Sequence, residues 1–298
     1  MRRHHRFGRE CGLAWGCHVA TSKEQLAARK RFKGKSKRYR RLTLPAVPAN
    51  SATMFPIRDH NPSGRTPFVT WGLMVANVLI FFTYVGFITN GPEINAFYYD
   101  WAFIPARLMA GDNAIALVTS MFLHGGWMHL LGNMLFLWIF GDNVEDEMGH
   151  LPYLVFYLAS GIAAALAQYA ADPGSVIPTV GASGAIAGVM GAYLLMFPKA
   201  RVDIFIFLII FIRIIPVPAW IMLGLWFVLQ FFGGLGADPS NGGVAYWAHA
   251  GGFVAGLLFA VPLWLRRGAR TFWQRNQGHP PHPEAQYTSS RLPKIRKK

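Results

Sequence analysis

The sequence predicts an all-α membrane protein built as a bundle of six transmembrane helices. Of its 298 residues, 53% are hydrophobic and only 14% are charged, whereas a soluble domain carries roughly a quarter charged residues. An apolar stretch needs about 20 residues to cross a hydrocarbon core roughly 30 Å thick. Six such stretches follow one another along the chain. They are expected near residues 68–89, 126–142, 152–171, 179–197, 214–233 and 245–265.

Basic residues flank the apolar body at both ends. Of the 29 Lys and Arg residues, 14 lie in residues 1–41 and nine lie in 266–298. Basic flanks of apolar spans stay on the cytoplasmic side of a membrane. The connection at 198–213 carries three further basic residues, and those at 172–178 and 234–244 carry none. Six crossings with both termini in the cytoplasm satisfy this distribution.

The chain divides into four parts by composition. Residues 1–53 are basic and lack sustained periodicity, which predicts a disordered tail. We expect this tail to be dispensable, because Met54 is itself a plausible start of translation. A juxtamembrane segment, 54–67, leads into the membrane domain, 68–265, and a basic cytoplasmic tail, 266–298, follows. Basic tails also occur in nucleic-acid-binding proteins, but a membrane-anchored chain favours the bilayer as partner, and no nucleic acid is expected.

Four polar residues are predicted to lie in one layer of the membrane. They are His129 and Asn133 in the second stretch, Ser183 in the fourth and His249 in the sixth. These stretches all run from outside to inside, and His129, Ser183 and His249 each follow the start of their own stretch by a few residues. At 1.5 Å per residue, each lies about 10 Å below the outer surface. Polar groups inside hydrocarbon are costly and are kept for function or for helix packing.

Small residues recur along the fourth and sixth stretches. Gly184 and Gly188 form a G-x-x-x-G pair, and Gly252 and Gly256 belong to a matching stripe. Such stripes let membrane helices approach closely. If these two helices pack through their small faces, His249 can reach the Ser183 hydroxyl. The alternative is that the stripes are packing surfaces only, with Ser183 a small interface residue and His249 a satisfied polar group.

The four polar residues together match the needs of a serine hydrolase. A serine hydroxyl is a weak nucleophile until a base takes its proton, and histidine suits that task near neutral pH. His129 and Asn133 are four residues apart, so both project from one helix face. That face can offer two donors to an oxyanion, beside the Ser183 amide. The alternative for Asn133 is that it only forms a hydrogen bond between helices.

Over residues 60–265 the chain resembles the rhomboid intramembrane serine proteases. The resemblance rests on four motifs that occur together. They are Gly181-Ala182-Ser183-Gly184 for the family's G-x-S-G, His249 with the following glycines Gly251 and Gly252, His129 to Asn133 for H-x-x-x-N, and Gly141, Glu145 and Gly149 for G-x-x-x-E-x-x-x-G.

This resemblance implies a rhomboid-like fold and a serine-type endopeptidase that needs no metal or other cofactor. It implies Ser183 as nucleophile and His249 as general base in a dyad without an acid, with His129 and Asn133 forming an oxyanion hole. The substrates would be membrane proteins cut in or near a transmembrane helix. Structural roles are implied for His124, Glu145, Gly181, Gly184 and Gly252. We expect a multi-pass protein of the bacterial plasma membrane, with its active site open to the outer face.

Some features depart from the family pattern or remain open. Some members stack an aromatic ring on the catalytic histidine from one turn beyond the serine, where this chain has Ala187. The glycine-rich loop at 233–243 is expected to cap the site, or else is an ordinary turn. The run at 202–212 either lies along the cytoplasmic interface or extends the fifth span. Aromatic residues of that span are expected to form a side gate towards the second, or to be ordinary interface residues; they are Trp226, Phe227, Phe231 and Phe232.

Two other functions compete with proteolysis. A catalytically inactive rhomboid-like protein that binds membrane proteins would keep the fold, but usually loses its serine or histidine. A transporter or channel would continue its polar residues down to the inner leaflet. The lower halves of the fourth and sixth stretches, 189–197 and 253–263, are almost purely apolar, which disfavours a through-path.

Overall fold

The computed structural model describes residues 53–61, 63–87, 90–208, 211–237 and 243–281. The predicted basic N-terminal tail therefore lies outside the described residues, apart from Thr53.

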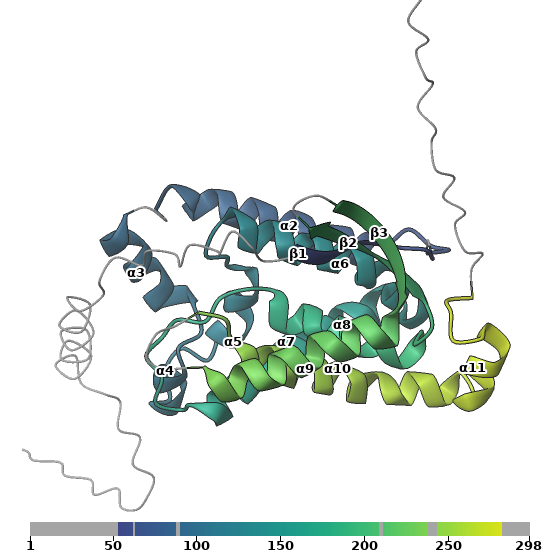
Figure 1. The fold of residues 1–298 in the computed structure, drawn as a ribbon. Helices are drawn as coiled ribbons and strands as arrows, with labels where there is room; N and C mark the ends of the chain where they lie inside the picture. The colour runs from purple at the N-terminus through teal and green to yellow at the C-terminus, as the bar shows by residue number, and fades with distance from the viewer. Residues whose placement is uncertain (1–52, 62, 88–89, 209–210, 238–242, 282–298) are drawn as a thin grey trace, which may run out of the picture. The chain divides into compact units, whose positions relative to one another are not determined.

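Within these residues, a long helix forms in each of the six predicted apolar stretches (Figure 1). By length and composition alone, α7, α9 and α10 could cross a membrane, and α2 and α8 are shorter apolar helices. The predicted all-α membrane fold is confirmed. The six helices are α2 (Phe68–Tyr84), α6 (Trp127–Met148), α7 (His150–Ala171), α8 (Ser183–Met196), α9 (Ala219–Gly236) and α10 (Tyr246–Arg266).

Short helical elements connect α2 to α6. This connection is joined to the segment before α8 by an isolated bridge between Phe103 and Thr179. The amide of Gly181 also donates to the carbonyl of Ser120, at 2.9 Å. The connection therefore lies beside the start of α8. Its elements are η1 (Val85–Phe87), α3 (Gly91–Trp101), α4 (Pro105–Met109), α5 (Ala116–Thr119) and η2 (Ser120–Phe122).

A three-stranded antiparallel sheet was not predicted. It has the order β1-β2-β3, and its strands are β1 (Thr53–Asp59), β2 (Arg201–Leu208) and β3 (Phe211–Pro218). Of the two alternatives for the run at 202–212, extension of the fifth span is wrong, because α9 begins only at Ala219. Pro216 and Pro218 lack the N–H that a helix interior needs, whereas an edge strand tolerates proline.

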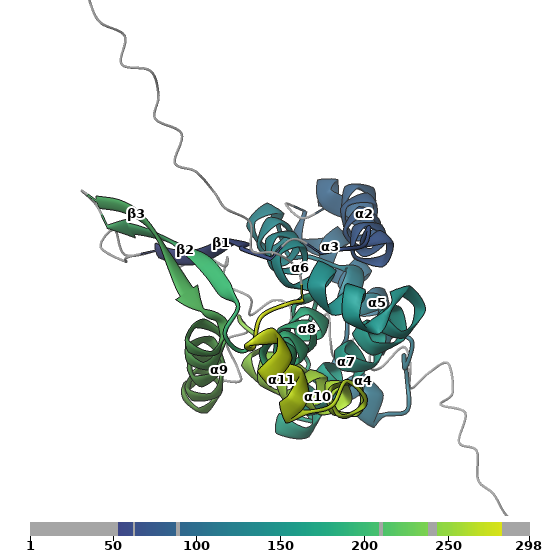
Figure 2. The same cartoon turned by 90° about the vertical axis from the view of Figure 1, so that its right-hand side faces the viewer.

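Two aspartates hold the sheet in place, Asp203 by joining β2 to β1 and Asp59 by joining β1 to the helices. Asp203 on β2 accepts hydrogen bonds from Arg58 Nε at 2.7 Å and His60 Nε2 at 2.6 Å. At the end of β1, Asp59 accepts from Asn143 Nδ2 of α6 at 2.8 Å and from the Tyr193 hydroxyl of α8 at 3.1 Å. Figure 2 shows the sheet to one side of the helices, beside α9. The N-terminal strand thus becomes part of the membrane domain.

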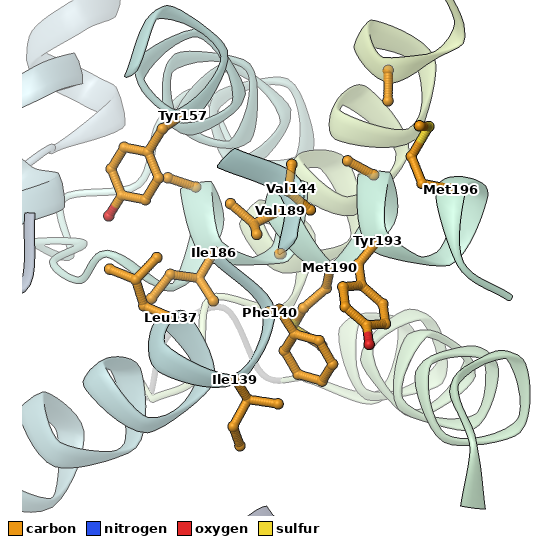
Figure 3. Close-up of a cluster of buried hydrophobic side chains, with 14 of the residues drawn as sticks. Leu137, Ile139, Phe140, Val144, Tyr157, Ile186, Val189, Met190, Tyr193 and Met196 are labelled. Carbon is orange, nitrogen blue, oxygen red and sulfur yellow. The ribbon is translucent and has the colours of Figure 1, made fainter. Parts of the chain in front are cut away.

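Helix α8 lies at the centre of the hydrophobic core. Side chains of α6, including Leu137 and Phe140, face Ile186, Met190 and Tyr193 of α8 (Figure 3). The rings of Phe140 and Tyr193 meet edge to face, with centroids 5.0 Å apart. Such burial of α8 holds its first residue, Ser183, at a fixed place in the bundle.

The first part of the predicted C-terminal tail is ordered and packs on the bundle. Helix α11 (Arg270–Asn276) buries Phe272. The indole of Trp273 donates to the carbonyl of Leu195, at 3.0 Å. The amide of Lys199 donates to the carbonyl of Gly278, at 2.9 Å. These contacts close the end of the bundle that carries the sheet.

Candidate active site

Helices α8 and α10 approach each other through glycine. A methyl group added to Gly252 would overlap the carbonyl oxygen of Gly184, and one added to Gly256 would overlap that of Gly188. A methyl on Gly184 would lie 2.6 Å from the Ala164 methyl of α7. The backbones meet closely because no side chain separates them, as small residues permit in membrane helix pairs.

Ser183 is the first residue of α8, not a residue several positions inside a span that begins at 179. The preceding segment is not helical. Thr179 pairs with Phe103, and Gly181 has a φ of +129°. This φ lies in a region that favours glycine. The Ser183 amide therefore stands among the N–H groups of a helix start, which have no partner within the helix.

The structure brings His249 directly to Ser183. His249 is the fourth residue of α10, and its Nε2 lies 2.8 Å from Ser183 Oγ. At this distance the two side chains are hydrogen-bonded, as a nucleophile and its base must be. The two residues are 66 positions apart in the chain, so the contact depends on the glycine packing of α8 against α10.

Two residues of α9 hold the His249 ring. Gln230 Oε1 lies 2.8 Å from His249 Nδ1. The Trp226 ring, one turn earlier, lies 5.9 Å from the imidazole between centroids, tilted by 33°. Trp226 thus supplies the aromatic contact with His249 that is absent at position 187, where this chain has alanine. Gln230 was not among the predicted site residues, although an amide within an apolar helix was a signal for it.

A second glutamine fixes the backbone beside His249. Gln168 Oε1 of α7 accepts a hydrogen bond from the Ala248 amide, at 3.2 Å. Ala248 lies in the first turn of α10, where amides have no acceptor within the helix. Gln168 therefore caps the turn that carries His249. It too was missed by sequence analysis.

His129 joins the serine and histidine. Its Nδ1 accepts a hydrogen bond from the Gly125 amide at 3.2 Å, which leaves the proton on Nε2. A methyl group on Gly181 would lie 2.8 Å from His129 Nε2 and 3.3 Å from Ser183 Oγ. The imidazole donor and the hydroxyl thus border one small space beside Gly181.

Asn133 lies one turn below His129 on α6 and is buried. Its Nδ2 donates to the carbonyl of His129, at 3.0 Å. This bond fixes the amide on the face of α6 that carries His129, and it uses one of the two N–H groups of Nδ2.

His124 is fully buried beside His129, with ring centroids 5.1 Å apart. Its carbonyl accepts hydrogen bonds from the hydroxyls of Tyr84 at 3.0 Å and Tyr98 at 3.3 Å. In the described part of the chain, neither ring nitrogen of His124 has a hydrogen-bond partner. The hydrogen bonds of His124 therefore anchor the loop before α6 through its backbone.

Glu145 lies far from the Ser183–His249 pair, in the last turn of α6. Its carboxylate accepts hydrogen bonds from the amides of Val69 at 2.9 Å and Thr70 at 2.8 Å, and from the Thr70 hydroxyl at 2.7 Å. His150 Nδ1 lies 2.6 Å from the same carboxylate. Glu145 thus caps α2, whose own preceding residue, Pro67, offers no capping side chain.

The aromatic residues of α9 contact α10. Phe227 and Phe253 rings lie 5.0 Å apart, and those of Phe231 and Trp247 lie 5.9 Å apart. The gate that these residues are expected to form towards the second span stays a prediction. The predicted loop cap at 233–243 falls partly on residues 238–242, which lie outside the described residues.

Within the described residues, no group of three His, Cys, Asp or Glu side chains is arranged to hold a metal ion. The side chains gathered at the site carry a hydroxyl, imidazole rings and amides.

Comparison with known proteins places the site within a matched domain. The profile of the rhomboid domain matches residues 112–266. Rhomboid protein 1, mitochondrial, from Saccharomyces cerevisiae is 32% identical over 151 residues, covering 49% of this chain and 40% of that protein. RHOMBOID-like protein 4 from Arabidopsis thaliana is 32% identical over 177 residues, covering 59% of this chain and 41% of that protein.

A bacterial relative is also similar. Rhomboid protease GluP from Bacillus subtilis is 33% identical over 149 residues, covering 50% of this chain and 26% of the relative. The chain spans less than half the length of these three curated relatives.

Proposed function

The chain belongs to the rhomboid family, and from this premise we propose that it is an intramembrane serine endopeptidase with a Ser183–His249 dyad. The observation that carries the proposal is the 2.8 Å contact between His249 Nε2 and Ser183 Oγ. It joins a nucleophile to a base between two apolar helices, where an unused polar pair is costly.

The reaction begins when His249 Nε2 takes the Ser183 proton and Oγ attacks a peptide carbonyl carbon. Negative charge then develops on the carbonyl oxygen. His129 Nε2–H, which borders the same space as Ser183 Oγ, is one donor to it. The Ser183 amide and the remaining Nδ2–H of Asn133 are the others.

The tetrahedral intermediate collapses when the C–N bond breaks and His249 gives its proton to the leaving amine. The acyl group stays on Ser183 as an ester. A water molecule then attacks the ester carbonyl while His249 again takes a proton. His249 passes the proton taken from water to Ser183 Oγ when the ester C–O bond breaks, which frees the carboxyl product.

The substrate proposed is a membrane protein cut in or near a transmembrane helix. A helix hides its carbonyl groups in hydrogen bonds, so the cut segment must unwind locally. Glycine and proline near the outer end of the substrate helix favour unwinding, since both are poor helix formers. The proposed setting is a bacterial plasma membrane, with both termini cytoplasmic and the site open to the outer face.

The test is labelling of the full chain in detergent by a fluorophosphonate, together with cleavage of a model transmembrane substrate. Wild-type protein is expected to be labelled and to cleave. Ser183→Ala and His249→Ala should each lose both activities by about a thousandfold or more. Ser160→Ala removes a buried hydroxyl from α7, and this matched control should retain both.

Labelling that survives Ser183→Ala would overturn the proposed nucleophile. A folded wild-type protein that is neither labelled nor active would instead favour an inactive rhomboid-like protein that binds membrane proteins.

A further inference from the structure

Gln230 is the only amide side chain in α9, which has no charged residue. The cost of placing an amide in hydrocarbon calls for a partner. Its Oε1 has one in His249 Nδ1, at 2.8 Å. A purely packing role for Gln230 would leave this hydrogen bond unexplained.

With Oε1 towards the ring, the contact favours one tautomer of the imidazole. A carbonyl oxygen only accepts hydrogen bonds, so the shared proton is on His249 Nδ1. In the neutral ring, Nε2 then carries a lone pair. That lone pair faces Ser183 Oγ, 2.8 Å away. This is the tautomer that a base for Ser183 must have.

We propose that Gln230 is a positioning residue of the dyad, which holds His249 in the tautomer and orientation that accept the Ser183 proton. The inference rests on the proposed function and deepens it. The amide takes the orienting part that a carboxylate plays in Ser-His-Asp triads. Because the amide is neutral, it orients the ring without adding a negative charge to a site inside the membrane.

None of the other described groups around His249 accepts a hydrogen bond from its Nδ1. Helix α8 contributes Ser183 on the opposite nitrogen, and α6 contributes His129 as a titratable neighbour. From α7, Gln168 bonds the neighbouring backbone, and from α9 Trp226 contacts the ring face. Throughout the described residues, no carboxylate is hydrogen-bonded to His249.

Three variants test the proposal in the full chain. Gln230→Leu introduces an apolar side chain of similar size and removes the acceptor. Gln230→Glu keeps an acceptor oxygen and adds charge. Leu229→Ala is the matched control, since Leu229 is the next residue of α9 and is 59% exposed. Thermal unfolding in detergent establishes that each variant is folded.

In Gln230→Leu, kcat for the model substrate should fall about tenfold to hundredfold with KM unchanged. Leu229→Ala should keep both values. In Gln230→Glu the acidic limb of the pH–rate profile should move to higher pH, because a carboxylate stabilises the imidazolium. A role in packing alone would not move that limb. Unchanged kcat in folded Gln230→Leu, with an unmoved limb in Gln230→Glu, would overturn the inference.

A readout without turnover separates this inference from the proposed function. In protein labelled with ¹⁵N-histidine, the wild-type His249 signal, assigned with His249→Ala, should be that of an Nδ1–H tautomer at neutral pH. Gln230→Leu should shift the signal towards Nε2–H. If Ser183-dependent cleavage is absent but this shift occurs, the proposed function fails and the positioning stands. If cleavage occurs and the tautomer does not change, only the positioning fails.

Discussion

The carbonyl oxygen of Gly184 occupies the place where a methyl group on Gly252 would lie. Gly252→Ala should therefore force α10 away from α8 and lengthen the Ser183–His249 contact. We expect a loss of about 1–3 kcal/mol in the free energy of unfolding and at least about a tenfold fall in kcat. Turnover and unfolding of the same preparation measure both.

The matched control is Gly224→Ala on α9, where nothing lies within 4 Å of an added methyl group. Its stability and turnover should match or exceed those of the wild type. Equal behaviour of the two variants would show that the close contact of α8 and α10 does not control the site.

Gly181 should matter more to activity than to stability. An alanine there carries a backbone φ of +129° and places its methyl 2.8 Å from His129 Nε2, in the space proposed for the oxyanion. We expect Gly181→Ala to lower kcat about a hundredfold or more and to destabilise by about 1–3 kcal/mol. Gly174→Ala, whose methyl would lie 3.8 Å from Asp172 Oδ1, is the control in the same connection. Full activity of Gly181→Ala would contradict the assigned oxyanion space.

Loss of the Glu145 carboxylate should lower the stability of the fold without lowering the turnover of folded molecules. Glu145→Ala removes the acceptor for the amides of Val69 and Thr70 and should cost about 2–4 kcal/mol. The turnover of the molecules that remain folded should stay near the wild-type value, because Glu145 lies in the last turn of α6, whereas His129 of the proposed site lies in the first. Glu93→Ala, at an exposed position, provides the comparison. Lower turnover per folded molecule would assign Glu145 a catalytic part as well.

Asp59 should make stability fall as pH rises. Burial, together with nearby Asp142, raises the pKa of Asp59 from its usual 3.8 to about 8. Between these values the folded protein keeps a proton that the unfolded chain releases, so the free energy of unfolding decreases with pH by up to about 1.4 kcal/mol per unit. Asp59→Asn should flatten this dependence between pH 4 and 8 and should unfold at higher temperature than the wild type at pH 9. Parallel stability curves for the two proteins would contradict the raised pKa.

The helices could be predicted because a helix that crosses a bilayer needs an apolar stretch of about 20 residues, and such stretches are visible in the sequence. The sheet could not. The run at 202–212 is as apolar as a membrane helix, and composition does not separate a short buried strand from a helix. Only the pairing of β2 with β1, some 145 residues earlier in the chain, as between Arg58 and Asp203, settles its conformation. The start of α8 was misplaced because the extended conformation of Thr179 depends on its pairing with Phe103.

The grouping of Ser183, His249 and His129 could be inferred from depth and from the stripes of small residues, since both are properties of the linear sequence. What holds His249 could not be inferred. Gln230 belongs to no motif, and its depth relative to His249 depends on where α9 begins. Sequence analysis placed that start five residues early, at 214, whereas α9 begins at Ala219.

Ser183, His129 and His249 lie in the first turns of α8, α6 and α10. Beyond Ser183, the buried residues of α8 are glycine, alanine, large apolar side chains and the tyrosine that bonds Asp59. Along α8, the described residues beyond Ser183 therefore offer no continuous line of buried polar side chains that water at the proposed site could follow. The proposed reaction would then use water in one half of the bundle, while the apolar interior around the rest of α8 would oppose the passage of ions and protons through the other half.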